Sequence, residues 1–187
     1  NYKLKNKKKI IVSSDHDYYQ LVNESTIIWS PTLKSFVDTK KVIDRFSIHP
    51  ENFCLAKSIV GDKSDNIPGV KGVGYKTLSK CFSKFLSSEP YDIQNLIVDT
   101  KEFKTSSKRK IFPAIEESED LIKRNWRLVL LDSNNLSHEQ IKKIDSCLEN
   151  FDLTWNNMLA HKIINQDGIR GIDLLSCSQL FRQLRKG

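Results

Sequence analysis

The sequence predicts an α/β protein with a small piece of parallel sheet, a hairpin and a helical remainder. Three observations indicate this class. A short β-branched run, Ile10–Val12, ends in polar residues and is soon followed by a second strand pattern. A glycine-rich bend at 69–74 stands between two helical patterns, and from residue 87 onward the spacing of apolar residues is helical. The length of 187 residues fits one domain or slightly more.

The composition favours a polyanionic partner. The net charge is +7 and the pI is about 9.2, which favours nucleic acid first and an acidic membrane surface second. No apolar run approaches the roughly 20 residues that span a bilayer, and no signal peptide is visible. The four cysteines have no Cys-x-x-Cys spacing, which argues against zinc and indicates reduced, cytoplasmic thiols: Cys54, Cys81, Cys147 and Cys177. The four histidines have no ligand spacing and are interpreted as surface or cap residues: His16, His49, His138 and His161.

The first elements begin after a lysine-rich segment. Asn1–Lys9 is interpreted as a solvated lead-in, and the opening on Asn1 rather than methionine leads us to expect a fragment, a processed product or a trimmed chain. Ile10–Val12 predicts a strand buried on both faces. The polar residues that follow it lie where open α/β sheets bind ligands. Among them, Asp17 is expected to cap a short helix at Tyr18–Val22.

A hairpin and two helices are expected next. Thr26–Trp29 and Ser35–Val37 predict two strands joined by a turn at 30–34. A helix should start at Asp38 or Thr39 and run through Phe46. Pro50 suits the first turn of the helix after it. The apolar residues of that helix are expected to point inward: Phe53, Leu55, Ala56, Ile59 and Val60.

The rest of the chain has helical patterns throughout. Thr77–Leu86 is expected to be a helix whose apolar stripe belongs to the core: Leu78, Cys81, Phe82 and Phe85. A basic loop is expected at Lys101–Lys110, and Ser137 with Gln140 resembles a capping box. The later helices are expected at Tyr91–Asp99 after Pro90, Ala114–Leu131 after Pro113, from Ser137 to Asn150, at Trp155–Ile164 and, after the loop Asn165–Gly171, at Ser176–Leu184.

The stretch Ser58–Thr77 combines carboxylates with a glycine hairpin. Asp62 and Asp65 stand just before three glycines, and cationic and hydroxyl side chains lie among and after them: Gly69, Gly72, Gly74, Lys71, Lys76 and Thr77. Exposed backbone N–H groups before a helix that starts near Tyr75 are suited to holding a phosphate. The alternative is an ordinary glycine-rich helix–turn–helix with solvated aspartates. A Walker-type phosphate loop is only loosely resembled, since no strand precedes the glycines.

Four aspartates are expected to come together: Asp15, Asp17, Asp62 and Asp65. Clustered carboxylates suit Mg²⁺ or Mn²⁺, and a cation offsets their mutual repulsion. Four aspartates could hold one ion, whereas a two-metal site for phosphodiester hydrolysis normally needs more carboxylates. The acidic run Glu116–Asp120 is interpreted instead as favourable charge at a helix N-terminus.

Two motifs resemble a known family. Val12–Leu21, followed by Gly61–Gly74, resembles the structure-specific 5′ nucleases, which include flap endonucleases, the 5′ exonuclease domains of bacterial DNA polymerase I and phage RNase H enzymes. Trp29-Ser30-Pro31, Glu117-Ser118-Glu119 and Leu128–Asp132 look most like the RNase H of T-even-type phages. The resemblance spans essentially the whole chain but only the C-terminal part of the family.

The resemblance implies a fold, a reaction and a location. The fold is a partial PIN-like domain with a helix–three-turn–helix element. It divides the chain into the end of the nuclease core (1–48), the DNA-binding element (49–86) and a helical region (87–187). The reaction is metal-dependent hydrolysis near 5′ ends, flaps and RNA primers in DNA replication, with two Mg²⁺ or Mn²⁺ ions in the complete enzyme. The location is the cytoplasm, that of the host if the chain is phage-encoded.

The resemblance also implies roles for individual residues. Asp15 and Asp17 match aspartates on the second-metal side, Asp62 matches the next ligand and Asp65 an acid that supports it. The DNA-gripping hairpin, which in relatives often holds K⁺ through carbonyl groups, is matched by Gly69, Val70, Lys71, Gly72, Val73 and Gly74. Lys76 and Thr77 would face the phosphates.

The family's N-terminal half, with its first aspartates and helical arch, has no counterpart in the sequence. Three functions are therefore open. The chain could be the C-terminal portion of a 5′ nuclease whose remainder comes from a second polypeptide, a split gene or a cleaved precursor. It could be a non-catalytic module that binds duplex DNA. It could also be a basic scaffold for replication proteins.

Overall fold

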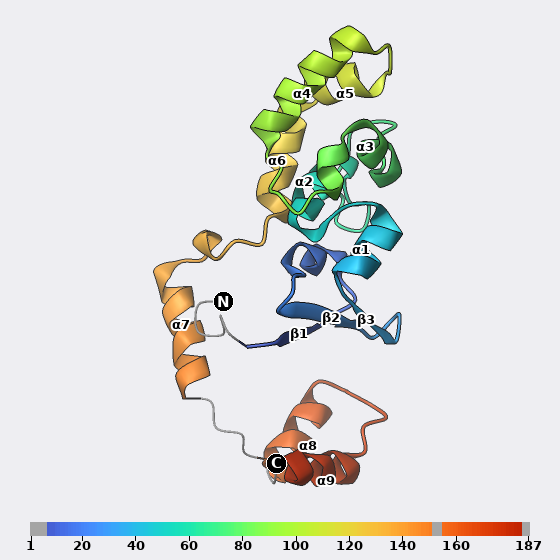
Figure 1. The fold of residues 1–187 in the computed structure, drawn as a ribbon. Helices are drawn as coiled ribbons and strands as arrows, with labels where there is room; N and C mark the ends of the chain where they lie inside the picture. The colour runs from blue at the N-terminus through green and yellow to red at the C-terminus, as the bar shows by residue number, and fades with distance from the viewer. Residues whose placement is uncertain (1–6, 151–154, 185–187) are drawn as a thin grey trace. The chain divides into compact units, whose positions relative to one another are not determined.

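The computed structural model describes residues 7–150 and 155–184 (Figure 1). The chain divides into two compact units, one that ends at Asn135 and one that begins at Leu136. Most of the expected lead-in, Asn1–Lys9, lies outside the described residues. The mixed α/β class that the sequence predicts is confirmed.

The first unit holds a small sheet followed by helices. In chain order its elements are β1 (Lys9–Val12), η2 (His16–Leu21), β2 (Thr26–Ser30), β3 (Ser35–Val37), α1 (Thr39–Phe46), η3 (Pro50–Asn52), α2 (Phe53–Val60), α3 (Tyr75–Cys81), η4 (Ser83–Leu86), α4 (Ile93–Ser106), α5 (Ile111–Glu117), α6 (Glu119–Val129) and η5 (Ser133–Asn135). The η elements are short 3₁₀ helices of three to six residues. The second unit holds α7 (His138–Glu149), α8 (Asn157–Gln166) and α9 (Leu174–Leu184).

The sheet has the strand order β1-β2-β3. β1 pairs with β2 in parallel, from Lys9 opposite Thr26 to Val12 opposite Trp29. β2 pairs with β3 antiparallel, with Trp29 opposite Phe36. The predicted parallel pair and the predicted hairpin are both confirmed.

β1 differs from the prediction that both of its faces are buried. Ile10 is 57% exposed and Val12 is 68% exposed, whereas Ile11 packs against the core. Within the described chain β1 pairs with β2 alone, and its half-buried residues alternate with exposed ones. One face and one edge of β1 are therefore left uncovered by the described chain, although the residues of this strand are apolar.

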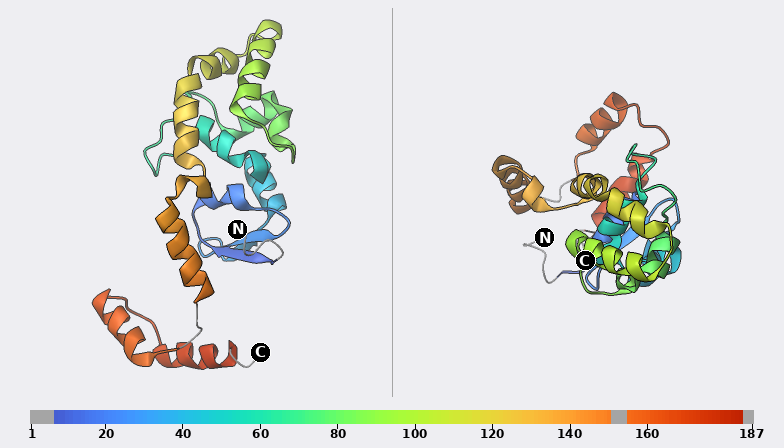
Figure 2. Two further views of the ribbon diagram at one scale, coloured as in Figure 1. Left: turned by 90° about the vertical axis from the view of Figure 1, so that its left-hand side faces the viewer. Right: turned by 90° about the horizontal axis from the view of Figure 1, so that it is seen from above.

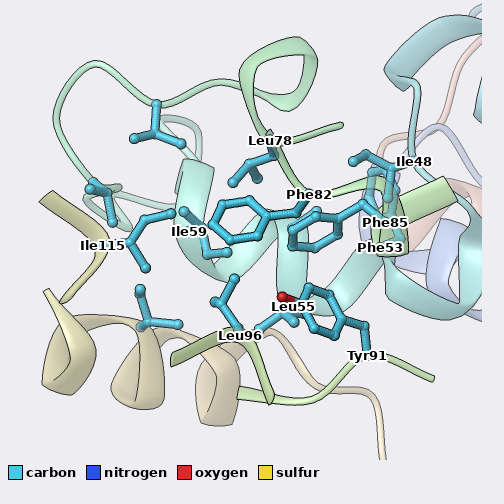
Figure 3. Close-up of a cluster of buried hydrophobic side chains, with 14 of the residues drawn as sticks. Ile48, Phe53, Leu55, Ile59, Leu78, Phe82, Phe85, Tyr91, Leu96 and Ile115 are labelled. Carbon is cyan, nitrogen blue, oxygen red and sulfur yellow. The ribbon is translucent and has the colours of Figure 1, made fainter. Parts of the chain in front are cut away.

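The core of the first unit surrounds α2. Phe53, Ala56 and Ile59 of this helix are fully buried. Figure 3 shows Phe53, Leu55 and Ile59 among side chains from α3, η4 and α4, namely Leu78, Phe85 and Leu96. α6 packs along α2, and α4 packs along α5 (Figures 1 and 2). The predicted inward stripe is confirmed for Leu78, Phe82 and Phe85, which are buried, and Cys81 is partly buried.

A buried asparagine, Asn52, fixes the path of the chain between α3 and α4. Its Nδ2 donates to three backbone carbonyls at 2.9–3.1 Å, those of Lys84, Ser87 and Glu89. Its Oδ1 accepts from the Tyr91 amide at 2.8 Å. One side chain thus satisfies the polar groups of an irregular segment that packs against the core.

The starts of two helices differ from the sequence-based expectation. Asp15, not Asp17, caps the first short helix, because its Oδ1 accepts from the Asp17 amide at 2.9 Å. α4 begins at Ile93 rather than Tyr91, because Asp92 caps it by accepting from the Asn95 amide at 2.7 Å. An Asp at the N-cap outweighs the proline signal.

Three further boundaries were also predicted wrongly. α4 runs on to Ser106, so that most of the predicted basic loop Lys101–Lys110 is helical; Phe103 anchors this extension against Phe82. The single helix predicted at Ala114–Leu131 is divided into α5 and α6 at Ser118. α3 ends at Cys81 and continues as the separate turn η4, which shortens the predicted helix Thr77–Leu86.

The second unit follows the prediction more closely. Ser137 and Gln140 form the predicted capping box at the start of α7. α8 and α9 each begin two residues from the predicted position. The ring centroids of Trp155 and Phe181 lie 5.6 Å apart. None of the helices in the described ranges has the length and apolar character to cross a membrane.

Two glycines allow the loop after α2 to fold back on that helix. Gly69 lies so close to Val60 that a Cβ atom would meet the Val60 carbonyl oxygen at 1.9 Å. Gly61 has a φ of +79°, and its Cβ would meet the Gly69 nitrogen at 2.4 Å. The Val70 amide donates to the Ile59 carbonyl at 2.7 Å beside this contact. The crossing fixes both ends of the loop that carries Asp62.

Gly69→Ala is expected to destabilise the protein by at least about 2 kcal/mol, because backbone atoms of α2 must move to admit a methyl group. Gly74→Ala is the matched control, since a Cβ there meets nothing within 4 Å. It should cost at most about 1 kcal/mol, as alanine is a poorer N-cap than glycine. Urea unfolding of both variants measures the difference, and equal costs would contradict the crowding at Gly69.

Candidate functional site

Asp17 is held at the end of β1 by a short, well-anchored turn. Asp15 caps this turn, and Gln20 ties it to the end of α6. The Gln20 amide donates to the Val129 carbonyl at 3.0 Å and accepts from the Leu131 amide at 3.0 Å. The same Nε2 also donates to the Asp17 carbonyl at 2.9 Å. The backbone of Asp17 is thus fixed against two elements.

Asp62 is held in the loop after α2. Its amide and carbonyl form paired hydrogen bonds of 2.8 Å with the carbonyl and amide of Ile67. Its Oδ1 accepts from the Ser64 amide at 2.8 Å. Asn125 of α6 is fully buried, and its Nδ2 donates to the carbonyls of Ser58 at 2.9 Å and Pro68 at 2.7 Å. This amide ties both sides of the loop to α6.

The ammonium group of Lys57 joins Asp17 and Asp62. Lys57 lies on α2 and is 2% exposed. Its Nζ forms ion pairs with Asp17 Oδ1 and, at 2.6 Å, with Asp62 Oδ2. A buried ammonium is tolerated only when it is paired and hydrogen-bonded. Two aspartates that are 45 positions apart in the sequence therefore converge on one cation.

The electrostatics of Asp62 follow from this contact. Burial alone would raise the pKa of its carboxyl group, but hydrogen bonds from Lys57 and Ser64 lower it to about 2. Asp62 is therefore ionised over the whole physiological range. It favours folding above the ordinary aspartate pKa, and this contribution is lost as the pH falls from about 4 towards 2.

The other two predicted ligands lie apart from this ion pair. Asp15 is exposed, and its Oδ1 is occupied by the cap of η2. Asp65 is exposed in the 62–68 loop. Within residues 7–150 and 155–184 no three acidic, histidine or cysteine side chains come close enough to hold a metal ion together. The structure thus brings two of the four predicted aspartates into one contact.

The charge of Asp62 affects two neighbouring ring systems, His16 and Tyr75. His16 is half-buried and stacks on Tyr19 with 4.9 Å between ring centroids, so that it is neither a surface nor a cap residue as expected. Burial lowers the pKa of His16, as do Arg45 and Lys57, against the opposite effect of Asp15 and Asp62. Burial raises the pKa of Tyr75, and the charge of Asp62 raises it further. His16 and Tyr75 are thus both within electrostatic reach of Asp62.

The glycine hairpin presents its polar side chains to solvent. Lys71, Lys76 and Thr77 are exposed, whereas Val70 and Val73 are buried and anchor the bend in the core. Gly72 has a φ of +78°, which explains a glycine there. Because the side chains of Val70 and Val73 are buried, these two residues can contact an external ligand only through their backbone groups.

Lys57 is the functional-site residue that the sequence analysis missed. It is the single charge in the helix Phe53–Val60, which is otherwise apolar apart from Ser58. A lone lysine in a buried helix signals an internal counter-charge. Asn125 gave no comparable signal, because nothing in the sequence shows which backbone groups an asparagine will bind.

The carboxylates of the site fit a small divalent cation. Asp17 and Asp62 direct oxygens at one point, and Lys57 shows that this point accepts a positive charge. Mg²⁺ is commonly bound by one or two carboxylates, with waters and substrate phosphates completing its shell. Two convergent carboxylates therefore meet its minimum requirement.

Comparison of the sequence with known proteins identifies relatives. No family model matches. The chain is 30% identical over 132 residues to a 5′-3′ exonuclease of Aquifex aeolicus, which covers 71% of this chain and 43% of the relative. It is 35% identical over 86 residues to a 5′-3′ exonuclease of Buchnera aphidicola, covering 45% of this chain and 30% of the relative. It is 32% identical over 108 residues to the thermostable DNA polymerase I of Thermus filiformis, covering 57% and 12%.

Solved structures give the same result. A zinc-bound 5′-exonuclease of phage T5 matches with a TM-score of 0.54 and 26% identity, over 64% of this chain and 42% of that chain. A flap endonuclease of phage T5 in a complex with DNA and metal ions matches with a TM-score of 0.53 and 25% identity, over the same shares. The chain thus spans less than half the length of these relatives. The resemblance to 5′ nucleases is confirmed, and the particular likeness to T-even-type RNase H stays a prediction.

Lys57→Met is expected to lower the free energy of unfolding by about 3 kcal/mol, because it leaves two facing carboxylates without their shared cation. Lys63→Met is the control, since Lys63 is exposed beside Asp62 and its loss should cost less than about 0.5 kcal/mol. Chemical denaturation at neutral pH measures both. A Lys57→Met protein as stable as the parent would contradict the ion-paired arrangement.

Proposed function

We propose, because the chain is a relative of the 5′-3′ exonucleases, that it is the C-terminal portion of a metal-dependent 5′ nuclease. It would act on duplex DNA with a 5′ flap or an RNA primer during replication. The observation that carries this proposal is the convergence of Asp17 and Asp62 on one cation beside the glycine hairpin. A carboxylate site for a hard cation is what metal-assisted hydrolysis of a phosphodiester requires, and exposed lysines in the hairpin suit the backbone of the nucleic acid.

The proposed ligands of the divalent ion are Asp17 and Asp62, with Asp15 and Asp65 close along the chain to act directly or through water. When bound, Mg²⁺ or Mn²⁺ supplies activation of a water and stabilisation of the leaving oxygen. Lys57 holds the two carboxylates in position by neutralising part of their charge. The complete enzyme would hold two ions.

The proposed duplex-binding surface is the hairpin Gly69–Gly74 together with Lys76 and Thr77. Exposed lysines neutralise backbone phosphates without regard to base sequence. A Cβ at Gly72 or Gly74 meets nothing within 4 Å, so that another backbone can approach here. A K⁺ ion held by hairpin carbonyl groups belongs to this proposal as well.

The proposal includes a partner that supplies the remaining nuclease half. β1 exposes Ile10 and Val12 and pairs on one side only within the described chain. The unpaired edge of β1 suits an added strand from another segment, and the exposed side chains of Ile10 and Val12 offer an apolar face for that segment to cover. A second polypeptide, or another part of a longer precursor, would complete the sheet and bring further carboxylates. Replication proteins are further candidates for partners.

The alternative is a duplex-binding module without catalysis. Lys57 already neutralises part of the carboxylate pair, and within the described ranges no third acidic side chain joins it. This arrangement is also what a structural ion pair requires.

A cleavage assay on a 5′-flapped duplex separates the two functions. With Mg²⁺ and a polypeptide that carries the N-terminal half of a related exonuclease, cleavage near the flap junction is expected; with EDTA none is expected. The Asp62→Asn variant should lose at least about tenfold in rate, because it removes a metal-binding carboxylate. Duplex binding without cleavage in any mixture would favour the binding module.

Lys76→Ala is expected to weaken duplex binding for all sequences and to lower the slope of log K against log salt concentration by about one. Lys84→Ala is the control, because Lys84 pairs with Asp99 and lies outside the hairpin. Fluorescence anisotropy at several salt concentrations, in EDTA, measures both slopes. An unchanged slope for Lys76→Ala would remove this residue from the proposed surface.

A further inference from the structure

A basic hollow lies beside the glycine hairpin and extends beyond it. It has a volume of about 570 Å³ and lies between the hairpin, α3 and the turn that connects α4 with α5. The side chains that matter here come from three segments: Lys71 of the hairpin, Thr77, Lys80 and Cys81 of α3, and Arg109 and Lys110 of the turn. Residues nearly 40 positions apart thus line one concave surface.

The charge of this hollow has one sign. Four cationic side chains line it, and no acidic side chain does. None of the four forms an ion pair with another described residue, whereas Lys84, Lys104 and Lys123 each do. Gathered cations repel one another, and a bound anion offsets this repulsion.

Arg109 is held toward the hollow by a contact with α3. Its Nη1 donates to Cys81 Sγ at 3.3 Å. Sulfur is a weak acceptor, and a guanidinium group carries five N–H donors in a planar fork. Most of the donors of Arg109 therefore remain for a ligand, and the fork suits phosphate oxygens. The exposed Thr77 adds a hydroxyl donor on the same surface.

We propose that this hollow binds a backbone phosphate of nucleic acid, with Arg109 and Lys110 as its principal ligands. It extends the duplex-binding surface from the hairpin onto the turn between α4 and α5. The inference rests on the proposed binding of duplex DNA, and it adds residues from outside the helix–turn–helix segment. In this arrangement the duplex passes from the carboxylates of Asp17 and Asp62 across the hairpin to the turn between α4 and α5.

The decisive variant is Arg109→Ala with Lys110→Ala. Both residues are exposed at the surface, so the folded state should be retained, as circular dichroism can verify. The matched control is Lys104→Ala with Lys123→Ala, which removes the same charge from exposed residues that pair with Glu116 and Glu119. Anisotropy titrations with a blunt duplex in EDTA, at several salt concentrations, give the binding slope of each protein.

The Arg109/Lys110 double variant should lower the salt slope by about one relative to the parent chain, as expected for loss of the single phosphate that the hollow binds. The control should change it by less than half of that. Equal slopes in the parent and the Arg109/Lys110 variant, or equal losses in both double variants, would overturn the inference. Because EDTA excludes metal-dependent cleavage, the binding result is independent of whether the chain belongs to a nuclease.

Cys81 provides a second readout at the same surface. Cys54 is buried, so a Cys147→Ser, Cys177→Ser protein leaves Cys81 as the accessible thiol among the four. Duplex DNA should slow its reaction with an anionic disulfide reagent, because the phosphate covers the hollow. Inorganic phosphate at equal ionic strength should slow it less. Equal protection by inorganic phosphate would indicate a site for free anions, and no protection by the duplex would place the DNA elsewhere; either result overturns the inference.

Discussion

The buried ammonium of Lys57 is the constraint around which the first unit is arranged. An ammonium taken out of water needs anionic partners, and no residue of α2 supplies one. The chain therefore brings Asp17 from the end of β1 and Asp62 from the loop after α2 to the same point. The capped turn, the Gln20 bridge and the glycine crossing at Gly69 all fix the backbone on which these aspartates stand. The sheet and the helical core thus meet at an electrostatic contact.

Local signals in the sequence were sufficient for the elements with strong periodicity or caps. The hairpin at 26–37, the helix Thr39–Phe46 and the Ser137 capping box lie where these patterns predict them. The helix ends that were predicted wrongly depend on packing: Phe103 of α4 continues the helix because it reaches Phe82 and Phe112. The predictions based on proline alone gave wrong starts for α4 and α5, which begin at Ile93 and Ile111. Sequence patterns therefore predicted the type of element better than its limits, because the limits are set by tertiary contacts.

For the site as well, the sequence indicated the residue types but not how they are arranged in space. The acids that could bind a cation were visible as residue types, but which of them converge depends on the loop 61–70 and on hydrogen bonds from Asn125. A lone lysine in an apolar helix was the available signal for the ion pair. The interpretation of β1 as doubly buried failed for a related reason. A run of β-branched residues shows that both faces can be buried, not which segment covers them.

The charge distribution bears on the choice between nuclease and binding module. Two carboxylates and one ammonium leave the Asp17–Asp62–Lys57 contact with a single negative charge. The hollow beside the hairpin is lined by Lys71, Lys80, Arg109 and Lys110, which form no ion pair with another residue that the structure describes. A duplex drawn to the cations is repelled at the acids unless a further cation binds there. A module that only held DNA would gain affinity from losing these acids, whereas an enzyme needs them to place a divalent ion against the phosphate. The residual negative charge is therefore easier to reconcile with catalysis than with binding alone.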